Sequence, residues 1–376
     1  MPPFRFIHSS DLHLGRKFLA VPEPPDGNVR GRLMEARHAA IGRLAAAARD
    51  RGARHVLLAG DTFDSATPSA QVVRQALGAM GDAQDVEWWL LPGNHDNLRD
   101  AEPLWEGIVR DAPANVHAIR EAAPVDLGGA TLLPAPVTHR DPGRDLTEAL
   151  VDMPSPDGMP RLGLAHGGVT DFSEGGAVVP SDRDRSARLD YLALGDWHGR
   201  LAIGPRVQFS GSPEQDRFRH DRRGCCLSVS LGGPGTEPAI EEVETGSFLW
   251  ARSDLRLGEG EDAAAAFRAV LPGTGRRDTL LKLVATGWAT LPQRAALEDA
   301  ALAETPDFAF LDLDMAALGL LHDEADLDGI DRSGALRMAA EDLHAAARDP
   351  ATAEADREIA GAALARLYGY MRAFDA

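Results

Sequence analysis

Three segments of the chain share an arrangement that constrains the fold more than any other feature of the sequence. VEWWLLPGNHD, LGLAHGG and YLALGDWHG each consist of an apolar run that leads directly into a polar loop containing glycine. A short apolar run that ends at such a turn signal predicts a buried strand. Ligands of open α/β sheets collect beyond the carboxyl ends of the strands, so we expect any chemistry to lie in these loops.

The rest of the chain extends this pattern in two parts. The first half alternates apolar runs such as FRFIH and HVLLAGD with a helical stretch at 30–51, and short strands separated by Gly and Pro at 207–245 predict that the sheet closes with antiparallel strands. Strands and helices then alternate up to an acidic loop at 322–331, followed by two Ala-rich helices. The last helix places Ile359, Ala363, Leu367 and Tyr370 at helical spacing, which predicts a face that packs on the chain itself or binds a partner.

A chain of 376 residues is longer than one core usually grows. We therefore predict a catalytic domain over residues 1–246 and an α/β capping and C-terminal helical region over 247–376. No apolar run approaches the roughly 20 residues of a membrane span, and the first residues do not resemble a secretory leader, so the predicted location is the cytoplasm. The adjacent Cys225 and Cys226 would form a strained bridge, which favours two small core residues.

The net charge of −19 argues against a general nucleic-acid coat protein, since phosphate binding relies on Lys and Arg. A basic groove or a metal site would still be able to hold DNA. Seven acidic residues between 181 and 225 are interleaved with a group of arginines, so a DNA path and a mixed solvated surface both remain open. The arginines are Arg183, Arg185, Arg188, Arg200, Arg206, Arg217, Arg219, Arg222 and Arg223.

The polar loops carry carboxylate, imidazole and amide groups. Each segment is a weak indication when taken singly, because an aspartate after a strand is more often a helix cap or turn former. Together they form the ligand set that suits hard or borderline divalent metals, and one carboxylate, Asp61, would bridge two ions. Two ions would lower the pKa of a shared water enough to make hydroxide, which predicts phosphoester hydrolysis. The loop residues are Asp11, His13, Asp61, Asp64, Asn94, His95, Asp96, His166, Asp196 and His198.

In this order, D-x-H, G-D-x-x-D, G-N-H-D, a strand-end His and a final G-x-x-H resemble the motifs of calcineurin-like metallophosphoesterases. IHSSDLHLGRKF, HVLLAGDTFDSATPS and FSGSPEQDRF are similar to the SbcD-type DNA repair exonuclease subunit in its YhaO-like form, over roughly Phe4 to Phe218. The resemblance implies an α/β fold, a two-sheet β-sandwich flanked by helices (αββα), with a smaller α+β C-terminal domain.

The resemblance also implies roles for single residues. Asp11, His13, Asp61 and His198 would hold the first metal, and Asp61, Asn94, His166 and Asp196 the second. His95, oriented by the Asp64 carboxylate, would act as the acid at the leaving oxygen, because an imidazole free of metal keeps its proton. From the residues themselves, the candidate substrate contacts are Arg16, Trp197, Arg200 and Arg217, and Trp197 would either have a structural role or stack on a base.

The final motif departs from the pattern, since it reads Gly195, Asp196, Trp197, His198 where the family has G-H-x-H. A bound carboxylate would make the two-ion site formally neutral and would favour manganese or magnesium, with iron(II) and zinc as alternatives. Asp196 would bind directly, through water, or not at all.

The leading functional hypothesis is a manganese-dependent DNA exonuclease or endonuclease subunit. The resemblance implies an SbcC-like or YhaN-like coiled-coil ATPase as partner, and a homodimer. Two alternatives remain: a phosphodiesterase for small or cyclic nucleotides, which an acidic surface tolerates more readily, and a non-catalytic regulatory subunit.

Overall fold

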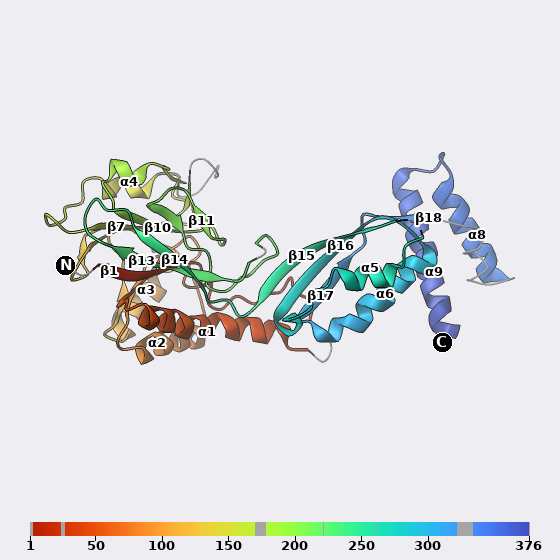
Figure 1. The fold of residues 1–376 in the computed structure, drawn as a ribbon, viewed down its shortest axis with the longest axis horizontal. Helices are drawn as coiled ribbons and strands as arrows, with labels where there is room; N and C mark the ends of the chain where they lie inside the picture. Colours follow the sequence, from red (N-terminus) through yellow and green to blue (C-terminus); the bar gives the residue numbers. More distant parts are fainter. Residues whose placement is uncertain are drawn as a thin grey trace. The chain divides into compact units, whose positions relative to one another are not determined.

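The computed structural model describes residues 3–23, 27–169, 178–220, 222–258, 260–321 and 334–375. The chain divides into two compact units, Met1–Leu249 and Trp250–Ala376, which we describe one at a time (Figure 1). The division lies three residues beyond the boundary predicted between 246 and 247. None of the helices in the described ranges is long and apolar enough to cross a lipid bilayer.

The first unit contains two six-stranded sheets. The first sheet has the order β14 (Ala239–Glu244), β13 (Cys225–Leu231), β1 (Phe4–Ser9), β2 (His55–Leu58), β3 (Glu87–Leu90) and β4 (Val116–Ala118). Strands β1 to β4 run parallel, whereas β13 and β14 extend the sheet through antiparallel pairs, as predicted. Cys225 and Cys226 at the start of β13 are buried and unbridged.

The second sheet has the order β11 (Leu201–Ala202), β12 (Val207–Phe209), β10 (Tyr191–Gly195), β7 (Arg161–His166), β6 (Thr131–Ala135) and β5 (Val125–Asp126). The prediction of antiparallel closure was wrong for β12, which runs parallel to β10. After β10 the chain forms the edge strand β11, and it then reverses to form β12 between β10 and β11. Because the chain reverses twice, β12 runs in the same direction as β10. A separate short pair joins β8 (Gly168–Val169) and β9 (Val178–Val179).

Apolar side chains from both sheets fill the space between them. Phe6 and Leu57 from the first sheet and Leu132, Leu164 and Tyr191 from the second are fully buried in one cluster. Burying one such side chain stabilises the fold by about 1.5–3 kcal/mol. This packing fixes the separation of the sheets and therefore aligns the loops at their edges.

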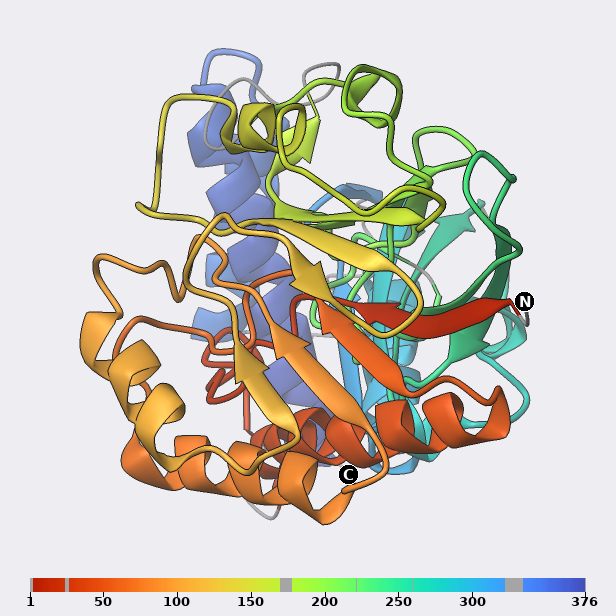
Figure 2. The same cartoon turned by 90° about the vertical axis from the view of Figure 1, so that its left-hand side faces the viewer.

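The outer faces of the two sheets are covered differently. Helices α1 (Val29–Asp50), α2 (Ala70–Asp82) and α3 (Glu102–Asp111) pack on the first sheet, where Trp88 and Trp105 are fully buried (red to orange in Figure 2). The second sheet is covered by the 3-10 helix η1 (Leu146–Leu150), the short helix α4 (Arg183–Ser186) and loops. The predicted αββα sandwich is confirmed, with a much smaller helical layer on the second sheet.

The second unit is a smaller α+β structure around a four-stranded sheet. Its central strand β16 (Thr279–Thr290) pairs with β15 (Leu249–Leu257), and in parallel with β17 (Phe310–Asp314) and β18 (Leu318–Leu321). Helix α6 begins at a capping box formed by Thr290 and Gln293. The helical elements are α5 (Ala263–Ala269), η2 (Arg276–Asp278), α6 (Leu291–Glu304), η3 (Thr305–Asp307), α8 (Ala335–Arg348) and α9 (Glu354–Asp375).

The predicted face of α9 packs on the chain only in part, since Leu367 contacts the apolar cluster formed with α8, and the partner alternative is not tested. Ile359 and Tyr370 are 66% and 68% exposed, whereas Ala360 and Leu364 are buried. The contact with α8 uses the neighbouring stripe of the helix, which the spacing of Leu364 from Ala360 also allows. The predicted acidic loop at 322–331 lies outside the described residues.

Candidate metal centre

The predicted ligands come from loops that follow five strands, three in the first sheet and two in the second. Within each sheet these strands run parallel, so their carboxyl ends meet at one edge. The packed sheets bring both edges together, and side chains that are up to 187 residues apart in the chain face one another. The loops place Asp11 and His13 after β1, Asp61 after β2, Asn94 after β3, His166 at the end of β7, and Asp196 and His198 after β10.

The backbone of these loops adopts an uncommon conformation. Asp11, His13, Asp61 and Asp196 have φ values of 55°, 44°, 54° and 100°, although L-residues other than glycine rarely have positive φ. Strain of this kind persists where the surrounding structure holds it, and it concentrates at functional sites. Gly60 has φ 90°, and a Cβ there would lie 2.2 Å from His166 Nδ1, so this position requires glycine.

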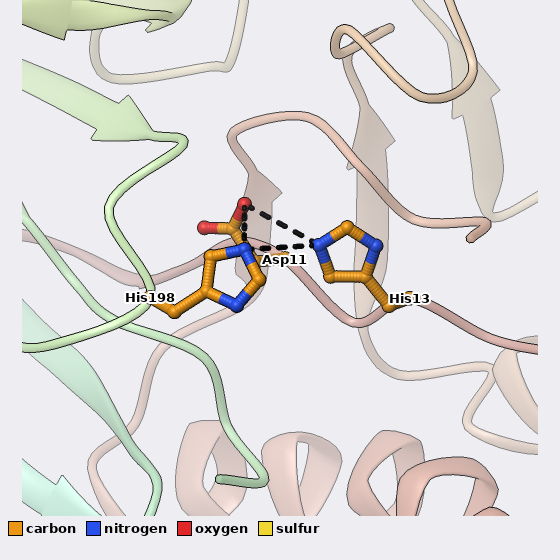
Figure 3. Close-up of side chains that lie close together, drawn as sticks. All are labelled: Asp11, His13 and His198. Atoms are coloured by element: carbon orange, nitrogen blue, oxygen red, sulfur yellow. Dashed lines mark hydrogen bonds and ion pairs between the residues drawn. The ribbon is translucent and has the colours of Figure 1, made fainter. Parts of the chain in front are cut away.

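The first ligand group consists of Asp11, His13 and His198, whose side chains point toward one another in Figure 3. His13 Nε2 lies 3.2 Å from His198 Nε2, and the two nitrogens lie 3.9 and 3.8 Å from Asp11 Oδ1. Two imidazole nitrogens and a carboxylate oxygen thus surround one point, as ligands of a single ion do.

Asp61 lies between this group and a second one. Its Oδ2 is 3.6 Å from His13 Nε2 and 3.5 Å from His166 Nε2. Its Oδ1 accepts a hydrogen bond of 2.9 Å from the backbone N–H of His95. The backbone therefore fixes one oxygen and leaves the other facing both groups, which is the position of a bridging ligand.

The second ligand group consists of Asn94, His166 and Asp196. Asp196 Oδ1 accepts a hydrogen bond of 3.1 Å from the Asn94 amide and lies 3.8 Å from His166 Nε2. Asn94 Oδ1 and His166 Nε2 are buried, and neither atom has a hydrogen-bond partner among the described residues. Buried polar atoms without a partner are costly. A divalent ion would satisfy both, so the residues present fit a pair of such ions.

Hydrogen bonds select the nitrogen that two of the histidines present to the cluster. His166 Nδ1 lies 2.8 Å from the Ala59 carbonyl, and His95 Nδ1 lies 2.8 Å from the Asp64 carbonyl. A carbonyl only accepts, so each Nδ1 carries the proton and donates it. Nε2 of His166 is then free to bind a metal, and Nε2 of His95 is free for substrate.

Asp64 acts through a different group from the one predicted. Its backbone carbonyl, and not its carboxylate, orients His95. The carboxylate Oδ1 lies 3.2 Å from His13 Nδ1 and 3.7 Å from Arg16 Nη1. The loop after β2 turns its carbonyl toward His95, which leaves the side chain to contact the first ligand group.

Two residues that the sequence did not indicate support His198. Asp216 Oδ2 lies 2.8 Å from His198 Nδ1, and the buried Arg37 contacts the same carboxylate at 3.4 Å. Burial alone would raise the pKa of Asp216, but the hydrogen bond with His198 and the charges of Arg37 and Arg16 hold it well below its usual range. A carboxylate behind a ligating histidine fixes the ring and increases its basicity. Asp216 lies in FSGSPEQDRF, but nothing in that segment shows that it reaches His198.

Asp96 joins two of the loops by hydrogen bonds, and its side chain does not face the ligand cluster. Its buried carboxylate accepts hydrogen bonds from the backbone N–H groups of Phe63, at 3.0 Å, and Gly93, at 2.7 Å. The loop that carries Asp61 is thereby joined to the loop that carries Asn94.

The cluster holds an excess of negative charge in a buried place. Burial raises the pKa of Asp61 to about 6, and the charges of Asp11 and Asp196 act in the same direction. Burial lowers the pKa of His166, but the negative charges of Asp61, Asp11 and Asp196 outweigh it and raise this pKa to about 9. Such groups bind either protons or a cation, so metal binding there should release protons.

The four predicted substrate contacts lie in different places. Arg16 Nη1 is 3.0 Å from Asp216 Oδ2, and Arg217 Nη2 is 3.1 Å from His198 Nε2, so both lie beside the first ligand group. Arg200 donates instead to the Phe209 carbonyl and to Gln208 Oε1, at 3.2 and 2.6 Å. The ring of Trp197 is covered by the Arg219 guanidinium, 4.3 Å from its centroid.

The chain is similar to known proteins in sequence and in fold. Residues 4–187 match the family model described as calcineurin-like phosphoesterase. The uncharacterized metallophosphoesterase YhaO of Bacillus subtilis (strain 168) is 25% identical over 292 residues, which cover 74% of this chain and 68% of that protein. The crystal structure of TT1561 of Thermus thermophilus aligns with 64% of this chain and 99% of its own, at a TM-score of 0.40 and 11% identity.

The matched residues 4–187 contain every predicted ligand except Asp196 and His198, and the structure brings those two to the same cluster. Residues 4–187 are thus similar to calcineurin-like phosphoesterases, and the ligand cluster lies where this similarity places the predicted ligands.

Proposed function

We propose that the protein is a two-metal phosphodiesterase that cleaves DNA, acting in the cytoplasm as a nuclease subunit in DNA repair. The observation that carries the proposal is the position of Asp61, whose Oδ2 lies 3.6 Å from one ligand group and 3.5 Å from the other. One carboxylate shared by two groups of oxygen and nitrogen donors is the arrangement of a dinuclear hydrolytic site.

Each group of side chains would hold one divalent ion. Asp11, His13, Asp61 and His198 are assigned to the first, and Asp61, Asn94, His166 and Asp196 to the second. When bound, two such ions lower the pKa of a shared water and neutralise charge on the phosphate. The oxygen-rich second group favours manganese or magnesium over softer ions.

His95 is the residue that would move a proton. Its Nδ1 is held by the Asp64 carbonyl, and its ring packs edge-on against His13 with the centroids 4.7 Å apart. The ring is therefore fixed beside the cluster, with Nε2 left to donate a proton to the leaving oxygen. Positioned acid catalysis of this kind contributes about 10²- to 10⁴-fold in rate.

DNA is the substrate that the SbcD-type motifs favour, and two arginines support it. Arg16 and Arg217 are 28% and 40% exposed and lie beside the first ligand group, where a phosphate next to the scissile one would pass. The same resemblance leads us to propose a homodimer and an SbcC-like or YhaN-like ATPase as partner.

The test compares the native protein with His95→Ala, using labelled single-stranded and double-stranded DNA with Mn²⁺. His139→Ala is the matched control, because His139 is exposed and lies outside the cluster. We expect cleavage by the native protein and the control, and a loss of about 10²-fold or more in His95→Ala. DNA cleavage that is equal in all three proteins would contradict the proposal.

The net charge of −19 favours one alternative, a phosphodiesterase for small or cyclic nucleotides. A small substrate carries fewer phosphates than DNA, so the acidic surface repels it less. Hydrolysis of a small chromogenic diester that depends on His95, with no cleavage of either DNA, would select this alternative.

A further inference from the structure

A cavity of about 480 Å³ lies at the amino ends of strands in the second sheet, and nothing in the proposed reaction uses it. Most of its lining residues precede or begin β7, β10 and β12, or belong to the segment around α4, and Pro234 and Gly235 come from the turn between β13 and β14. Its volume falls within the range of small-molecule sites. Four arginines line it: Arg161, Arg185, Arg188 and Arg206.

This cavity is separate from the metal centre. His166 and Gly195 are the last residues of β7 and β10, whereas Arg161 begins β7 and Asp190 directly precedes β10. Five residues of β10 span roughly 16 Å at about 3.3 Å per residue. The cavity and the ligand cluster therefore lie at opposite edges of the same sheet.

Two of the arginines are held in place by backbone carbonyls. Arg161 donates to the carbonyls of Met153 and Leu150 at 3.0 and 3.1 Å, and Arg206 donates to those of Leu189 and Gly235 at 3.2 and 2.7 Å. Carbonyls satisfy the hydrogen bonds of a guanidinium but do not cancel its charge. These two arginines thus form fixed, positively charged walls.

The other two arginines extend into solvent. Arg185 and Arg188 are exposed, and within the described ranges neither side chain has a hydrogen bond or an ion pair. Burial lowers the pKa of Arg161, and the positive charge of Arg188 lowers it further. The two like charges repel each other, so an anion bound between them would relieve the repulsion.

The acidic residues in the lining offset only part of this charge. Asp190 is buried, and its Oδ1 lies 3.8 Å from Arg206 Nη1. Its carboxylate also accepts hydrogen bonds from the backbone N–H groups of Arg161, at 2.8 Å, and Gly235, at 2.6 Å. Asp184 is the second acid. Four positive charges against two negative ones leave an excess of positive charge, on a chain whose net charge is −19.

We propose that this cavity binds the phosphates of a nucleotide, either free or as a unit of a nucleic-acid strand. Guanidinium groups donate two parallel hydrogen bonds to phosphate oxygens, and arginine is the side chain best suited to this contact. Met159, Leu189 and Pro234 provide an apolar wall for the base or sugar. The site binds without metal, so it does not depend on the proposed nuclease activity.

The test is calorimetric titration of the full-length, metal-loaded protein with adenosine diphosphate and with inorganic pyrophosphate. The variant is Arg185→Gln with Arg188→Gln, both of which are exposed positions. The control is Arg54→Gln with Arg110→Gln, which removes two charges from exposed positions elsewhere in the same unit. Unchanged hydrolysis of a small diester in all variants shows that the metal centre is intact.

We expect a binding event that weakens about tenfold or more in the cavity variant and not in the control. Competition by a single-stranded oligonucleotide would identify nucleic acid as the source of the phosphate, and its absence would identify a free nucleotide. Equal affinity in the native protein and the cavity variant would overturn the proposal, as would equal weakening in the control or no binding beyond the metal centre.

Discussion

The two ligand groups that share Asp61 differ in how the surrounding protein supports them. In the first group Asp11 and His13 are fully buried, and His198 is backed by Asp216, which in turn contacts Arg37 and Arg16. In the second group Asp196 is 35% exposed, and the Asn94 amide is the side chain that donates to it.

This difference predicts which of the two ions binds more tightly. A ligand fixed by buried charges is already in place before the ion arrives, so little entropy is lost on binding. An exposed carboxylate must be ordered as the ion binds. We therefore expect a tight first ion and a weaker, more exchangeable second ion.

The largest effect should come from the residue that both groups share. Asp61→Ala removes a donor from each ion, so we expect diester hydrolysis to fall by roughly a thousandfold or more, and both ions to bind more weakly. Titration with Mn²⁺ and steady-state rates measure the two effects, with the exposed Asp82→Asn as control. Weakening of one ion alone would show that Asp61 is not shared.

Asp216→Asn tests the support of the first group. The substitution keeps an oxygen near His198 but removes the charge, so the first ion should bind about 10- to 100-fold more weakly while the second is unchanged. Two-site analysis of a Mn²⁺ titration separates the ions. Equal weakening of both would contradict the assignment of Asp216 to the first group.

Asp196 tests the second group. Asp196→Ala should weaken the second ion about tenfold, whereas Asp196→His, which restores a metal-binding nitrogen, should keep two ions per chain. The measurement is the number of Mn²⁺ ions bound per chain at a fixed free concentration. Full occupancy in Asp196→Ala would mean that Asp196 is not a direct ligand.

A smaller effect, on the pH dependence of stability, should come from His8 in β1, the strand that precedes Asp11 and His13. His8 of β1 lies 2.9 Å from the Tyr191 hydroxyl and donates from Nε2 to the Leu194 carbonyl at 3.2 Å, and burial lowers its pKa from 6.5 to about 3. The unfolded chain binds a proton at His8 below pH 6.5, but the folded chain does so only near pH 3, so stability is lost as the pH falls through this window.

Between pH 6.5 and 5 this loss is about 1.6 kcal/mol. His8→Gln does not titrate, so its free energy of unfolding should fall by about 1.6 kcal/mol less over the same interval. Urea unfolding of both proteins at the two pH values provides the comparison. An equal change in the free energy of unfolding of both proteins between the two pH values would show that His8 is not a neutral buried residue in the folded chain.

The sequence predicted the strand-end positions of the ligands because each apolar run ends where its polar loop begins. Parallel strands carry the loops with Asp11, Asp61 and Asn94 to one edge of the first sheet, and the packing of the second sheet brings His166 to the same place. The two-sheet arrangement was predicted from the resemblance to metallophosphoesterases, not from this pattern.

Other features depend on contacts that no local pattern records. Asp216 contacts His198 although β11 and β12 separate them in the chain, and Arg37 contacts Asp216 from α1. Asp64 orients His95 through a backbone carbonyl, which is present at every residue. The direction of β12 depends on where β11 pairs. The buried stripe of α9 depends on how it packs against α8, since several stripes of an Ala-rich helix are equally apolar.

The most direct test of the central claim counts the ions that the native protein binds while its activity is measured. Mn²⁺ is titrated into metal-free protein, and hydrolysis of a small chromogenic diester is followed at each step. The account predicts two ions per chain, the first tighter than the second, with activity that appears only as the second site fills. Full activity with a single ion, or less than one tight ion per chain, would contradict the two-metal centre, and the latter result would favour a non-catalytic regulatory subunit.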